Sequence, residues 1–444
     1  MRRAAPLIAA CAAVALLSTL PPWALAFDPE AWLVWGREAL RLDLATAGGP
    51  SWKPLPVAVT TPLSLLGDAT PWAWLVFART AGLLALAGAA ALAWRISGSR
   101  AAALTAVLLV ALSPWWAFNT ALGNSEGMLA CALLWAVVAH LDDRRDAALL
   151  LALAAALLRP EVWPFLGLYA VWSWRSRPAS RALAAGVLLA IPIAWCVPEL
   201  LSSGQPFRAA DAALGTPSAE AAARAGHPWL EVFRDAADLA TLPVLLAFAA
   251  TVGLSNSSVR RVFQPNGLGV AAARDRGLSN SSVRRVQQPA GGGVVRWLGV
   301  GALAWVALVS VMTAAGFAGT PRYSAPAAAV AAVIAATVTA RHVALGLVLI
   351  AAAATLQLGP LNDQRAEMAR RADLRESLHR VIDEAGGPNA LRTCGPVRTD
   401  RTTTTTVAWH LDVPIAGLAT TPRTRDAVLL AETAGWRLRS ACGR

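Results

Sequence analysis

The chain has 444 residues, of which 56% are apolar and only 15% charged, and its mean hydropathy is positive. The formal net charge is +12, but the arginines are spread between apolar segments and form no basic stripe, which argues against nucleic acid as a partner. Apolar runs of about 20 residues, the length that a helix needs to cross a bilayer core, recur along almost the whole chain. Because every backbone amide inside lipid needs a partner, the composition predicts a polytopic all-α membrane protein and argues against a water-soluble one.

The first apolar run follows Met1-Arg2-Arg3 and is compatible with a signal peptide. No clean small-x-small cleavage site precedes Asp28, so we predict a retained first span with the N-terminus in the cytoplasm. Arginine-rich loops then alternate with poorer ones, and placing the rich loops in the cytoplasm fixes the topology in the cytoplasmic membrane. The eleven expected spans are 5–23, 71–94, 101–118, 127–141, 147–158, 162–174, 182–197, 239–254, 297–317, 323–340 and 343–358. Two short spans, or one long or broken helix, fit residues 147–174.

This topology divides the chain into a transmembrane domain, residues 1–358, and an extracytoplasmic C-terminal domain, residues 359–444. Within the first, residues 27–70 form an outer loop and residues 255–296 a cytoplasmic loop. A ten-residue unit, Gly253 to Val262, recurs in that cytoplasmic loop from Gly277 to Val286. A Gly/Ser/Arg-rich unit of this kind cannot bury a face, so we interpret it as a duplication in a loop beside anionic lipid.

The C-terminal domain is predicted to be a small α/β unit. We expect an amphipathic helix over 362–385, a strand over 402–411 and a further short element over 427–435. Cys394 and Cys442 lie in this polar tail. On an oxidising side they would form a disulfide, and the alternative is two unpaired thiols.

The first outer loop carries the most informative residues. Asp28 and Glu30 stand where an apolar helix meets water, and Lys53, the only lysine of the chain, lies between Trp52 and Pro54. On a helix the two carboxylates would diverge, whereas in an extended segment they could point the same way. Asp28 also fits a helix N-cap, a role that does not exclude chemistry.

Three further charges reach the same expected face. Glu126 opens the fourth span, Arg159 belongs to the short Arg-Pro-Glu segment, and Arg322 opens the tenth span. Ionisable residues at such positions are costly and are candidates for function, although a cap or a local ion pair explains each one singly.

These residue types fit an enzyme that uses a lipid phosphate. Lys53 and Arg322, with Arg37 or Arg159, would hold and neutralise a phosphate at the membrane interface. Asp28 would accept the proton of an attacking hydroxyl, with Glu30 and Glu126 as further candidate carboxylates. No nucleotide-binding glycine loop is present, and a divalent cation is possible but not indicated by any ligand motif.

With its acidic first outer loop, its Lys53-Pro54-Leu55-Pro56 segment and its short spans around Arg159, the chain resembles the GT-C superfamily of membrane glycosyltransferases. The likeness is greatest to bacterial, polyprenyl-phosphate-sugar-dependent enzymes similar to dolichyl-phosphate-mannose transferases. It implies inverting transfer of a sugar from a polyprenyl phosphate to an envelope glycan or glycoprotein outside the cytoplasmic membrane, with Asp28 at the catalytic acidic position. Here one proline of the lysine motif is displaced, and Pro29 separates the two acidic residues.

Two other functions remain compatible with the sequence. A catalytically idle GT-C-like scaffold would have the same spans and degenerate motifs. A polytopic transporter would have about a dozen spans, but it should show two related halves and a midplane site. No such internal symmetry is visible, and the candidate charges gather at one face.

Overall fold

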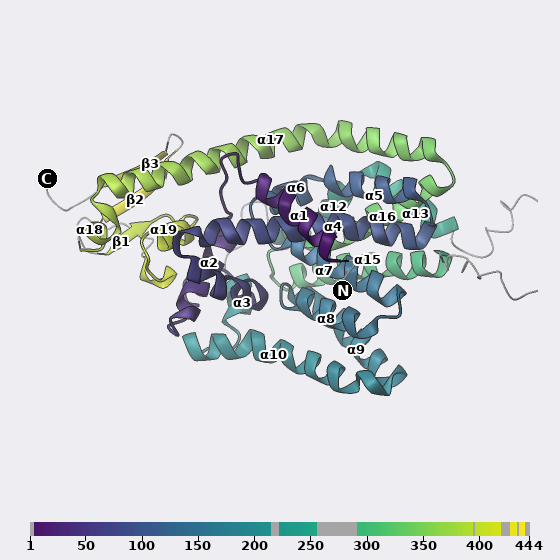
Figure 1. Ribbon diagram of the computed structural model, residues 1–444, viewed down its shortest axis with the longest axis horizontal. Coiled ribbons are helices and arrows are strands. Elements are labelled where there is room, and N and C mark those ends of the chain that lie inside the picture. Colours follow the sequence, from purple (N-terminus) through teal and green to yellow (C-terminus); the bar gives the residue numbers. More distant parts are fainter. Residues whose placement is uncertain are drawn as a thin grey trace, which may run out of the picture.

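The structure is a computed structural model that describes residues 4–214, 222–254, 291–393, 396–418, 427–432 and 435–439. The described chain is mainly helical (Figure 1). Its α-helices are α1 (Ala5–Leu17), α2 (Phe27–Leu40), α3 (Pro54–Leu63), α4 (Thr70–Ser97), α5 (Arg100–Ala111), α6 (Pro114–Ala121), α7 (Glu126–Leu141), α8 (Arg145–Ala156), α9 (Trp163–Ser176), α10 (Arg181–Ser203), α11 (Arg208–Leu214), α12 (Pro228–Ala240), α13 (Leu242–Leu254), α15 (Gly291–Ala314), α16 (Ala325–Ala336), α17 (Val343–Glu384), α18 (Gly387–Thr393) and α19 (Thr404–His410).

Short 3-10 turns and one small sheet complete the described fold. The turns are η1 (Ser64–Ala69), η2 (Pro160–Val162), η3 (Pro178–Ser180), η4 (Ala222–Arg224), η5 (Pro321–Ser324), η6 (Thr337–Ala340) and η7 (Ile415–Gly417), and the strands are β1 (Val397–Thr399), β2 (Ala427–Glu432) and β3 (Gly435–Arg439). The predicted disulfide between Cys394 and Cys442, and the duplicated segment beyond residue 254, lie outside the described residues.

The prediction of a helical membrane protein is confirmed, because each expected span overlaps helical chain, although the helix in the first span, 5–23, ends at Leu17. Among the described residues, five helical stretches are long and apolar enough to cross a membrane: Pro54–Ser97, Pro178–Ser203, Gly292–Ala314, Pro321–Ala340 and Val343–Glu384. Two bent helix pairs raise this number to seven. Large apolar side chains such as Leu189, Leu201 and Trp297 are exposed on these helices, as expected for a lipid-facing surface.

Two expected spans are bent. The span 101–118 is the pair α5 and α6, which meet at 64° just before Pro114, because proline cannot continue the hydrogen bonds of the preceding helix. Residues 239–254 are also broken: α12 ends at Ala240, and α13 leaves at 95° after Thr241, whose φ is 66°.

The predicted pair of short helices around Arg159 is confirmed as α8 and α9.

The expected break between a last span and an amphipathic tail helix is wrong. A single helix, α17, runs through Pro360 over 42 residues. Proline removes one backbone hydrogen bond, whereas the helix is fixed by packing on both sides of it. Leu349 and Ala353 are buried in the membrane core, and Leu378 and Ile382 are buried in the core shared with the C-terminal domain.

The C-terminal domain is confirmed as a mixed unit, but the strand expected over 402–411 is wrong. That segment contains α19, while the sheet has the order β1-β2-β3, with β1 parallel to β2 (Val397 opposite Ala427) and β2 antiparallel to β3 (Leu429 opposite Leu438). The run of threonines favours a strand by propensity. Tertiary contacts override it, because Val407 and Ala408 are fully buried and two threonine hydroxyls reach α2.

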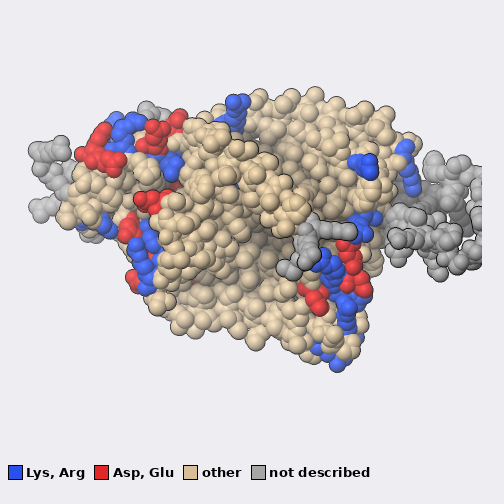
Figure 2. All heavy atoms as spheres, viewed as in Figure 1, with Lys and Arg blue, Asp and Glu red and all other residues tan. Residues whose placement is uncertain are grey.

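As far as the structure describes them, the expected inner and outer loops lie at opposite ends of the molecule. In Figure 1 the C-terminal domain and α2 lie at the left end, and α17 runs along the top from the other end to reach them. Loops expected in the cytoplasm contact one another: Arg95 pairs with Asp142, and Asp146 accepts a hydrogen bond from Ser180. Figure 2 shows most of the charged side chains of this view toward the two ends, with a wide uncharged surface between them.

The first outer loop is not an open loop but two packed helices. Nearly all of α2 is buried, and α3 lies directly against it. The close approach requires Gly36, because a Cβ there would lie 2.3 Å from the Thr60 hydroxyl oxygen. That hydroxyl donates to the carbonyl of Trp32 at 2.7 Å. The outer segment is therefore a rigid platform for the charges that it carries.

Candidate functional site

Six charged side chains from distant parts of the chain meet at the end where α2 lies. They are Asp28, Lys53, Glu126, Arg159, Glu161 and Arg322, which we call the charged cluster. Asp28 lies in the first turn of α2, Lys53 directly precedes α3, and Glu126 begins α7. The remaining three come from the 3-10 turns η2 and η5 and the residue before η2. Three cations and three carboxylates balance each other.

Asp28 is held by two cations. Its Oδ2 atom accepts hydrogen bonds from Lys53 Nζ at 3.1 Å and from Arg322 Nη2 at 3.3 Å. Burial alone would raise the pKa of Asp28, but the positive charges of Lys53 and Arg322 outweigh burial and hold the pKa well below its ordinary value. Asp28 is thus an ionised carboxylate with little basicity as long as both cations remain on it.

Arg159 connects the other two carboxylates. Its Nη2 atom donates to Glu126 Oε1 at 2.5 Å, and its Nη1 atom lies 3.6 Å from Glu161 Oε1. The guanidinium also lies 4.3 Å from the ring centroid of Tyr323, a cation–π distance. Since Arg159 and Glu126 are almost completely buried, each of the two charges would be costly without the other.

The cluster is open at Arg322, whose side chain is 32% exposed, against 9% for Lys53 and 14% for Asp28. Arg322 Nε also lies 3.8 Å from Glu126 Oε1, so this residue bridges both halves. Several buried polar atoms in and beside the cluster have no hydrogen-bond partner among the residues that the structure describes: Glu126 Oε2, Glu161 Oε2, Arg159 Nε, Ser125 Oγ and Thr320 Oγ1. Buried polar atoms in this state indicate a place where water or a polar ligand completes the hydrogen bonding.

The structure does not bring Glu30 and Arg37 to the charged cluster. Glu30 lies on the first turn of a helix, so it diverges from Asp28 and accepts hydrogen bonds from Thr405 and Thr406 of the C-terminal domain. Arg37 donates to the carbonyl oxygens of that same domain, Trp409 at 3.1 Å among them. Both residues dock the C-terminal domain onto α2.

Helix capping, the structural role weighed for Asp28, is not observed. The N-cap of α2 is Ala26, and no side chain bonds to the free amides of that helix end. Ser125, at the N-cap of α7, makes no side-chain cap either. The carboxylates at these two helix ends, Asp28 and Glu126, are engaged in ion pairs and not in caps.

Sequence reasoning missed a second buried ion pair, between Glu199 at the end of α10 and Arg208 at the start of α11. Arg208 Nε donates to Glu199 Oε2 at 2.7 Å, and Arg208 Nη2 donates to Oε1 at 3.0 Å. Glu199 is fully buried. The available signal was a carboxylate at the end of an apolar span followed by an arginine nine residues later.

An apolar cavity of about 740 Å³ lies between α7, α8, α9, α15 and α16. One end adjoins the charged cluster: Val162 follows Glu161, and Trp305, which stacks on Phe165, donates to the carbonyl of Tyr323 at 2.8 Å. The opposite end is lined by His140, Tyr169 and Trp172, near the loops expected in the cytoplasm. The cavity therefore runs from the charged cluster along the helices.

A divalent cation was left possible by the sequence. Within the described residues there is no group of three or more histidine, cysteine, aspartate or glutamate side chains that could hold a metal ion. The carboxylates of the charged cluster are each paired with arginine or lysine.

No protein-family model matches the chain, and no curated protein sequence matches it either. The helical fold is shared with a solved structure. The solved structure that shows this is the crystal structure of ArnT from Cupriavidus metallidurans bound to undecaprenyl phosphate. It aligns with a TM-score of 0.55 and 14% sequence identity, over 95% of this chain and 86% of that one. The apo structure of the same ArnT aligns with a TM-score of 0.38 at 16% identity, with the same coverage.

Proposed function

We propose that the chain is an inverting glycosyltransferase, which moves a sugar from a polyprenyl-phosphate donor to a glycan or glycoprotein acceptor of the cell envelope. The observation that carries the proposal is the apolar cavity ending beside the charged cluster. A polyprenyl phosphate has this combination of a long apolar tail and an anionic head. The solved ArnT structure of similar fold has undecaprenyl phosphate bound, which supports the same ligand class here.

In the proposed site, the donor phosphate binds between Lys53 and Arg322. Lysine offers a compact charge and arginine a planar fork, and both suit phosphate oxygens. The phosphate competes with Asp28 for these two cations, because the third cation of the cluster, Arg159, is paired with Glu126 and Glu161. We keep Arg159 as a support of the phosphate site, and we leave Arg37 and Glu30 out of it.

Exchange of partners activates Asp28. Once the phosphate holds Lys53 and Arg322, Asp28 loses the charges that depress its pKa, and the nearby anion raises the pKa further. The acceptor hydroxyl then attacks the anomeric carbon from the face opposite the phosphate. The new carbon–oxygen bond forms as the bond to the phosphate oxygen breaks, the hydroxyl proton passes to Asp28, and the polyprenyl phosphate leaves with its charge neutralised by the two cations.

The proposal places the reaction at the outer face of the cytoplasmic membrane, with the N-terminus in the cytoplasm and the C-terminal domain outside. The clustering of the arginine-rich loops at the end opposite the charged cluster supports this orientation. The C-terminal domain lies against α2 beside the site, so it is placed to contact the acceptor.

The test measures lipid-linked sugar turnover in membranes that contain the wild-type chain, Asp28→Asn or Glu231→Gln, at equal expression. Radiolabelled polyprenyl-phosphate sugars are supplied, and the label is followed into envelope polymers. We expect Asp28→Asn to lose transfer by about 10²–10⁴-fold, the usual contribution of a general base. The control removes a carboxylate from the exposed Glu231–Arg234 pair of α12 and should transfer normally.

Binding of undecaprenyl phosphate separates catalysis from recognition. Asp28→Asn should bind it as tightly as the wild type or more tightly, because asparagine no longer competes for Lys53 and Arg322. Equal transfer by Asp28→Asn and wild type would remove Asp28 from catalysis. Binding without transfer from any donor sugar would favour the idle scaffold, and the lack of both would favour a transporter.

A further inference from the structure

The loop between α2 and α3 carries Lys53 at its end and is fixed along its length by contacts that the proposed reaction does not use. Thr46 is fully buried, and its hydroxyl contacts Ser202 Oγ at 2.7 Å and Glu199 Oε2 at 3.3 Å. Trp52 donates through Nε1 to the carbonyl of Ala194 at 3.1 Å. All three partners belong to α10, so the loop lies against one side of that helix.

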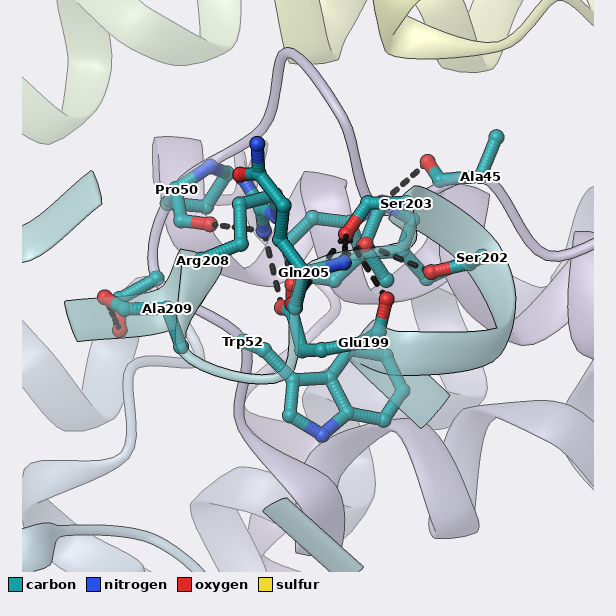
Figure 3. A network of polar contacts seen from close by, with 12 residues as sticks. Ala45, Pro50, Trp52, Glu199, Ser202, Ser203, Gln205, Arg208 and Ala209 are labelled. Atoms are coloured by element: carbon teal, nitrogen blue, oxygen red, sulfur yellow. Dashed lines mark hydrogen bonds and ion pairs between the residues drawn. The ribbon is translucent and has the colours of Figure 1, made fainter. Parts of the chain in front are cut away.

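Arg208 is the central member of this arrangement (Figure 3). With two nitrogens it grips both carboxylate oxygens of Glu199, and its Nη2 atom also donates to the carbonyl of Pro50 at 3.3 Å. Ser51 donates to the carbonyl of Ala209, next to Arg208, at 2.9 Å. The loop is therefore held to α11 two and three residues before Lys53.

The opposite side of the same loop rests on α2. The ring centroids of Trp35 and Trp52 lie 5.6 Å apart, and Trp35 donates to the carbonyl of Ala45 at 3.2 Å. Gly49 packs so closely that a Cβ there would lie 2.3 Å from the Trp35 ring. The loop is thus enclosed between α2 and the α10–α11 corner, and it leaves this enclosure at Lys53.

We infer that Arg208 and Glu199 are positioning residues for Lys53: they fix the loop so that the ammonium group is held at Asp28 and at the site of the donor phosphate. This inference rests on the proposed function. Lys53 Nζ donates to Asp28 and lies 5.0 Å from the centroid of the Trp32 ring. The lysine side chain is a flexible four-carbon stem, so it reaches these groups only from a backbone that is held at the right place. The backbone on its N-terminal side is set by Arg208 through Pro50.

The simpler role, stabilisation of the fold by a buried ion pair, makes a different prediction. If the pair only stabilises the fold, its loss should affect the position of Lys53 no more than that of any other residue of the site. Its effect on ligand binding should then add to the effect of a substitution at Lys53. A positioning pair acts through Lys53, so its effect should vanish once the ammonium group is removed.

Arg208→Lys is the variant that separates these roles. It keeps a cation on Glu199, and so avoids an unpaired buried carboxylate, but lysine lacks the planar fork that reaches Glu199 and Pro50 together. Arg95→Lys, in the exposed pair with Asp142 at the other end of the molecule, is a matched control with the same substitution.

The first measurement needs no ligand. It follows the reactivity of the Lys53 amine, which can be observed singly because Lys53 is the only lysine of the chain. Amine labelling with an activated ester, followed by mass spectrometry of the peptides, reports the Lys53 rate separately from the introduced lysine. We expect labelling of Lys53 to rise about fivefold in Arg208→Lys, the effect of losing roughly one ordinary hydrogen bond, and to stay unchanged in Arg95→Lys. An unchanged Lys53 rate in a folded Arg208→Lys protein would overturn the inference, whatever the ligand proves to be.

The second measurement is binding of undecaprenyl phosphate by wild type, Arg208→Lys, Lys53→Met and the double variant. We expect Arg208→Lys to weaken binding about fivefold in the wild type and by less than twofold in the Lys53→Met background. Equal losses in both backgrounds would show a structural role and overturn the inference while leaving the proposed function intact. If the wild type does not bind, the proposed function fails, and the labelling result still decides whether Arg208 positions Lys53.

Discussion

The two sides of the first turn of α2 carry the same functional group and use it in opposite ways. Asp28 faces two cations, which hold its pKa below the ordinary value despite burial. Glu30, two residues later, is buried against threonine hydroxyls. Burial raises its pKa to about 7, and the hydrogen bonds from Thr406 and Thr405 and the more distant Arg371 and Arg375 offset only part of that rise. The surroundings of Asp28 favour its ionised form, and those of Glu30 favour its protonated form.

The difference shows how position on a helix separates chemistry from docking. Residues two apart point about 200° away from each other on a helix, so one carboxylate meets Lys53 and Arg322 while the other meets α19. The Asp28 side is held by full charges, and removing one leaves an uncompensated charge. The Glu30 side is held by neutral groups, so its stability depends on pH.

The largest expected effect is on the Asp28 side. Glu126→Gln removes the carboxylate nearest to the buried Arg159 and leaves the longer ion pair with Glu161, and a buried charge that is poorly compensated is costly. We expect the free energy of unfolding to fall by about 3 kcal/mol, measured by denaturation in detergent. Loss of the exposed carboxylate in Glu231→Gln should cost less than about 1 kcal/mol. Equal losses in the two variants would mean that the charged cluster is not held by its ion pairs.

A smaller effect is expected on the Glu30 side, and it depends on pH. The folded-state pKa of Glu30, about 7, lies above the ordinary value of 4.5, so the folded chain binds this proton more tightly than the unfolded chain does. The resulting stability is present at acid pH and is lost as the pH rises through 7. Between pH 5 and pH 8, the wild type should lose about 2 kcal/mol more than Glu30→Gln, which cannot titrate.

Parallel stability curves for these two proteins across that range would show that Glu30 is already ionised at acid pH. Other titrating groups, Glu38 among them, are present in both proteins and cancel in the difference. Burial also raises the pKa of Glu38 to about 7, against the backbone hydrogen bond that it accepts from Ala45.

The smallest expected effect comes from the hydroxyls that face Glu30. Thr406→Val removes the hydroxyl that donates to Glu30 Oε2 and leaves that of Thr405. We expect a loss of about 1 kcal/mol in the free energy of unfolding at pH 8, the usual net value of one hydrogen bond. Thr402→Val, at an exposed position, should change nothing measurable. A larger loss at pH 5 than at pH 8 would contradict the protonation assigned to Glu30.

Much of the fold could be predicted from apolar periodicity, because long apolar runs have few alternatives to membrane helices. The errors are local and have physical causes. Pro114 bends a predicted span, whereas Pro360 does not interrupt α17, since packing on both sides holds that helix. The threonine run before Val407 has strand propensity and is helical, because its contacts are tertiary.

The sequence predicted what kind of site to expect, but not which charged residues belong to it. Asp28, Lys53, Glu126, Arg159 and Arg322 meet as charges expected at one face, and their roles stay proposals. Glu30 and Arg37 lie nearby and are also a carboxylate and a cation, but their side chains point toward the C-terminal domain. Nothing in the local sequence separates these two groups, because helix phase and the neighbouring domain decide which way each side chain points.

The sequence by itself determined that this is a membrane protein, in what approximate order its helices follow one another, and that charges gather at one membrane face. These follow from hydropathy and arginine placement, which act along the chain. Only the tertiary structure decided which charges pair, which carboxylate is buried with hydroxyls, and how Arg208 reaches the loop that ends at Lys53. Those outcomes depend on distances between residues far apart in the chain, and electrostatic interactions change steeply with distance and burial.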